Sequence, residues 1–198
     1  MTSIQDYRIF QPPQPLNFYE WTTQEARTYF NWFIAQIPER LKMLRTLAVD
    51  LGVSETSLDL TPESMPALGF LLGSMTSKRI KDVAETLSER EAQPEWMRPY
   101  LEDWTLSQET LSVCVDCGIY FAEALRLRHP KLKWDFVRRG KSNIEFHQPV
   151  LVPFPHGVEL NPVSIMTVVA FGHTRGKPAA ARLPEVYHVW ESKAEQNF

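Results

Sequence analysis

The chain of 198 residues is 43% hydrophobic, 23% charged and 12% aromatic, which is typical of a globular domain large enough to bury a core of its own. Its formal net charge of −3 gives no overall electrostatic reason to bind nucleic acid or an anionic membrane. We expect a cytoplasmic protein, because the sequence has no apolar run of the ~20 residues that span a bilayer, no secretion signal and too few cysteines for a disulfide framework.

The N-terminal residues 1–21 are predicted to form an extended arm. Pro12, Pro13 and Pro15 fall in a stretch without hydrophobic periodicity. Aromatic side chains within this stretch should hold part of it against the body of the protein. The remaining residues, 22–198, are predicted to fold as one domain.

Two helices are predicted in the next part of the chain. Thr22 and Glu25 form a capping box at the start of residues 22–51, where apolar residues recur every three or four positions. Pro38 lies inside this pattern and should bend the helix, because proline lacks the N–H and crowds the preceding turn. A second helix is predicted over 62–72, with a threonine before it as N-cap.

The middle of the chain is less regular until a third long helix begins. Residues 73–106 are predicted to hold a short helix followed by a packed connector that contains Trp96. Ser107 is the expected N-cap of a helix over 108–128, which Pro130 should end.

The last third of the chain changes character. The segments "KLKWDFV" and "NIEFHQPVLVPF" alternate or run apolar and are separated by a glycine-containing turn, which predicts two antiparallel strands. The segment "GVEL" is left open as a third strand. Asn161 should cap a helix over 162–171, residues 172–184 are expected to form a loop, and a last amphipathic turn or two should follow.

This order of elements predicts an α+β fold. A helical part over 22–128 precedes a sheet-plus-helix part over 129–198. We expect an N-terminal helical layer followed by a small antiparallel sheet with helices packed on one face.

Cys114 and Cys117 form a CxxC motif with three possible interpretations. A redox pair should begin a helix, but these residues lie about two turns into one. A zinc site needs four ligands, and the sequence has no second CxxC. Since free cysteine is among the most buried residue types, we favour core packing, with no metal and no cofactor.

Charge is divided between two stretches of opposite sign. Residues 126–141 hold seven basic side chains and one acidic, a net charge of +6, whereas residues 82–116 hold nine acidic and two basic, a net charge of −7. The stretches could steer a partner, form ordinary solvated surfaces or pair with each other in the fold. If the basic stretch is functional, an acidic protein is the expected partner, because no nucleic-acid-binding signature accompanies it. The candidate binding residues are Arg126, Arg128, Lys131, Lys133, Arg138, Arg139 and Lys141.

Two further candidate sites come from helical spacing. Asp116, Tyr120 and Glu123 share one helix face and could form an acid–base site, or they could hydrogen-bond to neighbouring structure. Trp32 lies off the apolar stripe of the first helix, where it is either a binding anchor or a plug between layers.

Three segments resemble a group of uncharacterised bacterial proteins that carry a domain of unknown function and are small, stand-alone and cytoplasmic. The segments fall within 22–51 and 107–171, and they include a D-x-G-x-Y-x-x-E pattern at 116–123, the strand at Trp134 and the pair Asn161–Pro162. The resemblance implies no chemistry. In style the chain is also similar to immunity proteins that neutralise bacterial toxins, which is an analogy.

These observations predict a non-enzymatic protein-binding module, either an immunity-type protein that neutralises a toxin or a regulatory partner. The alternative is a small-molecule-binding protein or an enzyme that uses Asp116, Tyr120 and Glu123 in a cleft between helix and sheet. A purely structural scaffold subunit is a third possibility.

Overall fold

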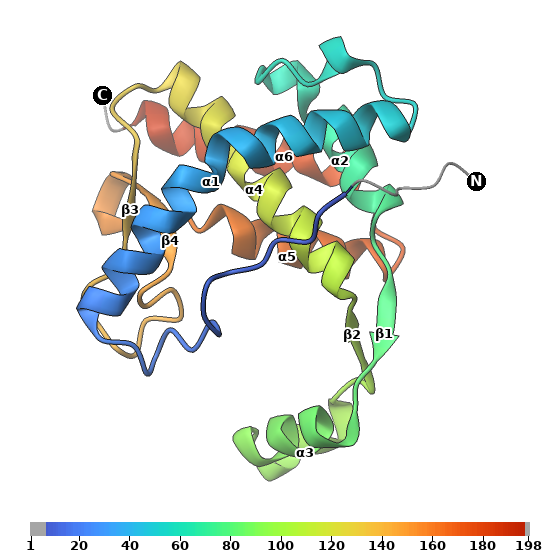
Figure 1. The fold of residues 1–198 in the computed structure, drawn as a ribbon, viewed down its shortest axis with the longest axis vertical. Helices are drawn as coiled ribbons and strands as arrows, with labels where there is room; N and C mark the ends of the chain where they lie inside the picture. The colour runs from blue at the N-terminus through green and yellow to red at the C-terminus, as the bar shows by residue number, and fades with distance from the viewer. Residues whose placement is uncertain (1–6, 197–198) are drawn as a thin grey trace.

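The computed structural model describes residues 7–196, apart from the side chain of Glu55, and confirms the α+β class. Six α-helices form most of it: α1 (Thr23–Asp50), α2 (Met65–Ser74), α3 (Val83–Ala92), α4 (Gln108–Arg128), α5 (Pro162–His173) and α6 (Ala179–Glu195). Two antiparallel pairs of strands join them (Figure 1): β1 (Lys78–Ile80) with β2 (Trp104–Leu106), and β3 (Lys133–Phe136) with β4 (Pro149–Val152). Short 3-10 turns are η1 (Glu55–Ser57), η2 (Pro62–Ser64), η3 (Glu95–Tyr100) and η4 (Pro155–Gly157).

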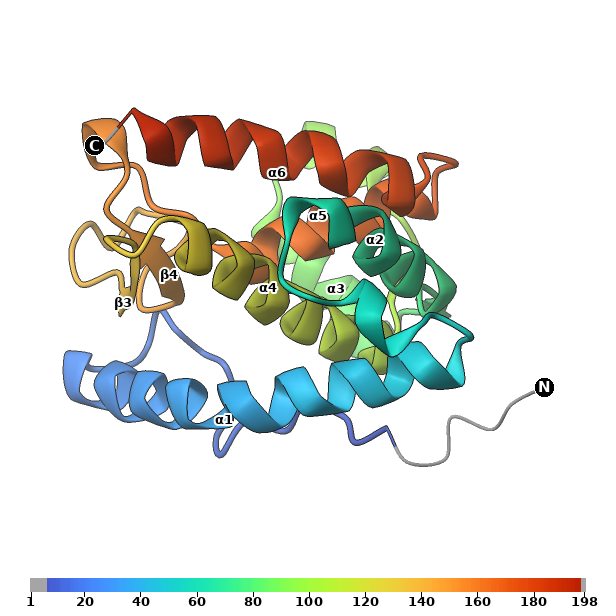
Figure 2. The ribbon, with the colours of Figure 1, turned by 90° about the horizontal axis from the view of Figure 1, so that it is seen from above.

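Helix α4 is the centre of the core. It lies between α1 on one side and α2, α5 and α6 on the other (Figure 2). The side chains of Val113, Tyr120, Phe121 and Leu125 are fully buried, because α4 has neighbours on nearly every side. Ser107 caps the helix as expected, since its hydroxyl accepts a hydrogen bond from the Thr110 N–H at 3.2 Å.

The sequence also predicted the start of α1 correctly. Thr22 and Glu25 make the reciprocal hydrogen bonds of a capping box. Pro38 lies inside the helix, which continues through it to Asp50. The predicted cap of the second helix is wrong in detail: the Thr61 side chain makes no capping bond, and η2 precedes α2 there.

The predicted strand pair is confirmed. β3 and β4 are antiparallel, with Lys133 opposite Val152 and Phe136 opposite Pro149. The segment left open as a third strand makes only a single bridge, between Leu160 and Leu151. Trp134 of β3 contacts Phe33 of α1 at a ring-centroid distance of 5.4 Å, which joins the small sheet to the helical layer.

The expectation of a loop over 172–184 and a short final helix was wrong. Helix α6 begins at Ala179 and runs for 17 residues, with Pro184 inside it. Its residues Ala179, Leu183 and Tyr187 recur every four positions and are buried, so tertiary packing stabilises the helix despite the proline.

Within 73–106 the predicted short helix is confirmed as α3, but the expectation of a packed connector after it was wrong. β1 and β2 form a two-stranded stalk that carries α3 and η3 away from the body (Figure 1). We call residues 78–106 the protruding arm. Between residues 78 and 105 no side chain is buried, and Trp96, the expected anchor of the connector, is 71% exposed.

Candidate functional site

Polar side chains on the protruding arm hold α3 in place. Asp82 and Glu85 form a capping box at the start of α3. Glu85 also accepts hydrogen bonds from Arg79 of β1, one of them at 2.7 Å, and these bonds lower the pKa of Glu85 to about 2. Lys81 pairs with Glu89 and donates to the Glu102 carbonyl at 2.9 Å. Glu85 and Glu89 of α3 are therefore paired with residues of the stalk within the arm.

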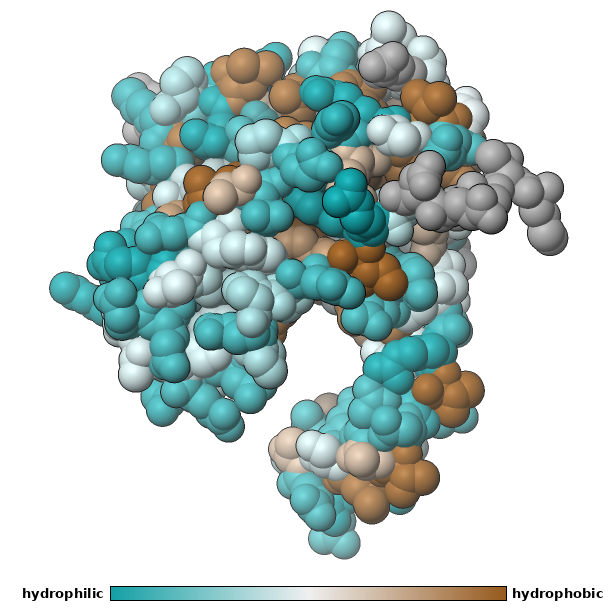
Figure 3. All heavy atoms as spheres, in the orientation of Figure 1, coloured by the Kyte–Doolittle hydropathy of each residue, from teal (hydrophilic) through white to brown (hydrophobic). Residues whose placement is uncertain are grey.

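The apolar side chains of the arm, by contrast, face solvent. Five large ones are between 53% and 81% exposed: Ile80, Val83, Leu87, Trp96 and Tyr100. Figure 3 shows the arm standing clear of the body, with brown apolar surface on it. Several large apolar side chains exposed on one element are typical of an interaction site.

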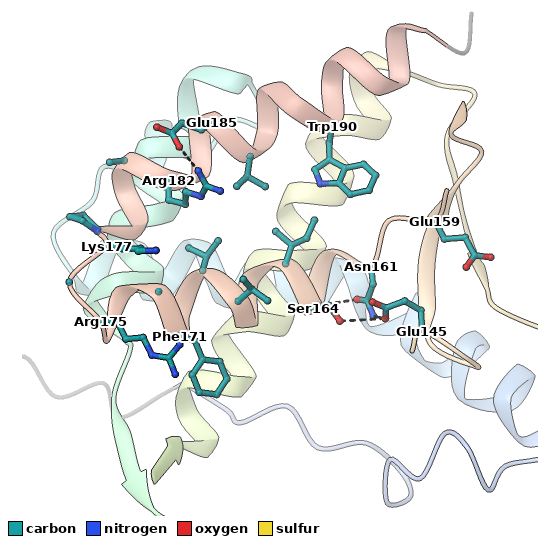
Figure 4. A pocket seen from close by; sticks show the side chains of 18 residues that line it. Glu145, Glu159, Asn161, Ser164, Phe171, Arg175, Lys177, Arg182, Glu185 and Trp190 are labelled. Carbon is teal, nitrogen blue, oxygen red and sulfur yellow. Dashed lines mark hydrogen bonds and ion pairs between the residues drawn. The ribbon is translucent and has the colours of Figure 1, made fainter. Parts of the chain in front are cut away.

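A groove between α5 and α6 is the second prominent surface feature. Its cavity volume is about 1170 Å³ (Figure 4). Its lining includes the apolar side chains of Ile165, Val168, Val169, Phe171, Val186 and Trp190. Basic side chains gather at the end nearest the arm, where Arg175, Lys177 and Arg182 lie, and Glu145 and Glu159 lie at the other end.

Fixed contacts hold the two ends of the groove. At the acidic end, the side-chain amide of Asn161 donates hydrogen bonds to the Glu145 carboxylate and, at 2.8 Å, to the side-chain oxygen of Gln148. At the basic end, Arg182 pairs with Glu185 at 2.6 Å. Lys177 makes no ion pair with the residues that the structure describes.

Asp116, one of the three candidate acid–base residues, is part of a buried ion pair. Arg40 of α1 donates to both carboxylate oxygens, from Nε at 2.6 Å and from Nη2 at 2.7 Å, and the Tyr7 hydroxyl donates to Oδ2 at 2.5 Å. Burial raises the pKa of Asp116 to about 6, against the opposing hydrogen bonds and charge of Arg40. Ser112 Oγ accepts the Phe10 N–H at 2.6 Å beside this pair, so the cluster holds the N-terminal segment against the core.

Tyr120 and Glu123 do not face a common cleft with Asp116. The buried Tyr120 hydroxyl donates to Ser64 Oγ and accepts the Leu60 N–H, both at 2.7 Å. Glu123 accepts bonds from Arg126 and from the Trp134 indole, also at 2.7 Å. Each of the three candidate residues is thus occupied by separate structural partners.

The two cysteines are core residues, as the sequence predicted. Cys114 and Cys117 both have 0% exposure, and burial raises the pKa of the Cys114 thiol to about 12. Within residues 7–196, no three His, Cys, Asp or Glu side chains lie close enough together to hold a metal ion.

The basic stretch lies at the end of α4, on β3 and on the loop after β3. Three of its arginines have acidic partners: Arg126 pairs with Glu123, Arg128 with Glu191 at 2.6 Å and Arg138 with Asp135. The remaining candidates on this surface, Lys131, Lys133, Arg139 and Lys141, are exposed. Among the described residues, no ion pair joins this stretch to the acidic stretch 82–116.

Trp32 is half-buried, and its packing explains its place off the apolar stripe. Its ring lies 5.3 Å from Phe10 of the N-terminal segment and 5.7 Å from Tyr29, measured between centroids. It is a contact between the N-terminal segment and α1, which is the alternative that the sequence had left open.

Comparison with protein-family models, curated proteins and solved structures found no match. Among the helices described, none is long and apolar enough to cross a bilayer.

The sequence did not single out the arm or the groove. Ile80, Val83 and Leu87 have helical spacing and predicted only a short helix on a polar stretch. A usable signal was present in α5, because apolar residues occupy nearly all its sides and one neighbouring layer cannot cover them all.

Proposed function

We propose that this protein is a protein-binding module whose binding element is the protruding arm. One observation carries the proposal: the arm is ordered by its own ion pairs, yet its five large apolar side chains are more than half exposed. Burying each of them against a partner contributes about 1.5–3 kcal/mol, which is enough for a specific complex after the losses of association are subtracted.

The chemistry of the arm defines the kind of partner. The protruding arm, residues 78–106, carries seven acidic and five basic side chains, a net charge of −2. The arm therefore favours a protein surface with an apolar groove and basic residues at its edge. Trp96 and Tyr100 are the expected anchors, because large aromatic side chains dominate binding energy at interfaces.

The experiment is site-specific photo-crosslinking in the native cell. A photo-reactive residue replaces Trp96 on the arm or, as the control, Val49, which is 51% exposed on α1. We expect a protein adduct at position 96 that is absent at position 49 and that disappears when Leu87→Asp is added. Equal labelling at both positions, or none at 96, would contradict the proposal.

That the protein is an immunity-type protein is a more specific prediction than that it binds another protein. It requires that the adduct be a toxin and that the protein rescue cells from it. Rescue that survives Leu87→Asp and Trp96→Asp would exclude the arm as the neutralising element.

A further inference from the structure

The outward face of α5 is an apolar surface that no other part of residues 7–196 covers. Val168 is 70% exposed in the middle of the groove, with Ile165 one turn before it and Val186 of α6 opposite. A helix that is apolar on nearly all its sides is normally buried on all of them. Another element of apolar character should therefore fill this groove.

We propose that α3 of a second copy of this chain fills the α5–α6 groove and that the exchange is reciprocal, so that two copies form a dimer. The inference rests on the proposed function of the arm and names its partner. Each copy offers the exposed helix α3 and the open α5–α6 groove. In a twofold dimer the helix of each copy fills the groove of the other, so one kind of contact occurs twice.

The shapes of the two elements fit. An open groove between two helices accepts the apolar face of a third helix. The ten residues of α3 span ~15 Å and the twelve of α5 span ~18 Å, so α3 can lie along the groove. Val83 and Leu87 are four residues apart and share one face of α3, which is the face that would meet Val168.

The charges of the two elements are complementary. At the basic end of the groove Arg182 pairs with Glu185 and Arg175 with Glu102, which leaves Lys177 without an ion pair among the described residues, whereas α3 carries three glutamates against one arginine, a net charge of −2. The net negative charge of α3 therefore favours the end of the groove where Lys177 lies.

The position of the arm favours exchange between copies. The arm leaves the body beside the basic end of its own groove, where Glu102 lies 3.4 Å from Arg175 and Trp104 contacts Phe171 at 5.7 Å between ring centroids. From there it points away from the body (Figure 1), so α3 lies clear of the groove in its own copy.

The first test is the mass of the full-length protein in solution. Sedimentation equilibrium should give twice the chain mass of 22.9 kDa at high concentration. Leu87→Asp on the arm and Val168→Asp in the groove should each weaken the dimer at least about tenfold, because each places a charge in the apolar contact. The control Val49→Asp changes a valine on α1 that is 51% exposed, close to the 53% of Leu87, and should leave the dimer intact.

A disulfide test locates the contact. Leu87→Cys chains carry a tag, so that a mixed dimer differs in size from a dimer of like chains, and they are mixed with Val168→Cys chains under mild oxidation. The native thiols of Cys114 and Cys117 are buried and do not compete. A mixed dimer should form faster than one between Leu87→Cys and Val49→Cys chains. Equal rates for the two pairs would overturn the inference.

The outcomes separate the inference from the proposed function. A protein that stays monomeric, or a dimer that both aspartate variants leave unchanged, overturns the exchange. If position 96 on such a protein still crosslinks to a different protein, the arm remains a binding element and only its partner was wrong. If nothing crosslinks, both proposals fail.

Discussion

Removal of Asp116 is the perturbation whose effect the structure determines most fully. Asp116→Ala leaves the guanidinium of Arg40 inside the protein without its carboxylate, and the side chain of Arg40 is only 6% exposed. Three donors lose their acceptor, namely two N–H groups of Arg40 and the hydroxyl of Tyr7. Breaking a buried pair in this way is expected to lower the free energy of unfolding by about 3–5 kcal/mol.

The double variant Arg40→Met with Asp116→Ala separates the ion pair from simple loss of packing. It removes the stranded charge, and Tyr7 can still hydrogen-bond to Ser112, 2.9 Å away. The double variant should therefore be more stable than Asp116→Ala alone by about 2 kcal/mol. As a surface control, Glu39→Ala removes an exposed partner 4.0 Å from Arg8 and should change stability by less than about 0.5 kcal/mol.

Urea unfolding followed by tryptophan fluorescence and by far-UV circular dichroism measures these differences. Limited proteolysis gives a second readout, because the same cluster holds the N-terminal segment through the bond from Arg40 to the Arg8 carbonyl at 2.8 Å. Cleavage between residues 8 and 20 should accelerate in Asp116→Ala. A loss below about 1 kcal/mol, or a double variant less stable than the single one, would refute the buried-pair reasoning.

Three further predictions follow from single sites. Gly69→Ala should destabilise the protein by about 1–3 kcal/mol in urea unfolding, because a Cβ there would lie 2.5 Å from the Ala179 carbonyl oxygen. Gly172→Ala is the control and should have little effect, because the nearest atom to its Cβ would be 3.8 Å away. Equal losses of stability in the two variants would contradict the close contact between α2 and α6. The thiol of Cys114 should resist a thiol reagent at pH 8 until the chain unfolds, and rapid labelling of the native protein would count against its burial. An NMR titration of the carboxyl of Asp116 should have its midpoint near pH 6, above the ordinary 3.8, because burial makes the folded state bind the proton more tightly; a midpoint below 3.8 would mean that the attraction of Arg40 outweighs burial.

The sequence predicted elements whose signals are local. The capping box at Thr22 and Glu25 and the cap at Ser107 mark the starts of α1 and α4, and apolar spacing marks their buried faces. The burial of Cys114 and Cys117 followed from their position inside a helix that is apolar on several sides.

Features that depend on tertiary contacts were not predictable in the same way. Pro184 reads as a helix break, but the burial of Leu183 and Tyr187 stabilises α6 around it. The partner of Asp116 is Arg40, 76 residues away, so helical spacing suggested an acid–base site where the fold makes an ion pair. The arm was missed because the same apolar residues can face a core or solvent, and only the path of the chain decides between these.

Hydrogen exchange of the α3 amides, Val83–Ala92, across a dilution series of the full-length protein tests most directly whether a second copy covers this helix. These amides should exchange more slowly as the protein concentration rises, together with those of α5 around Val168, and Leu87→Asp should abolish the dependence. Exchange in α3 that is fast and identical at every concentration, with α5 equally unaffected, would contradict the claim that another copy covers this helix.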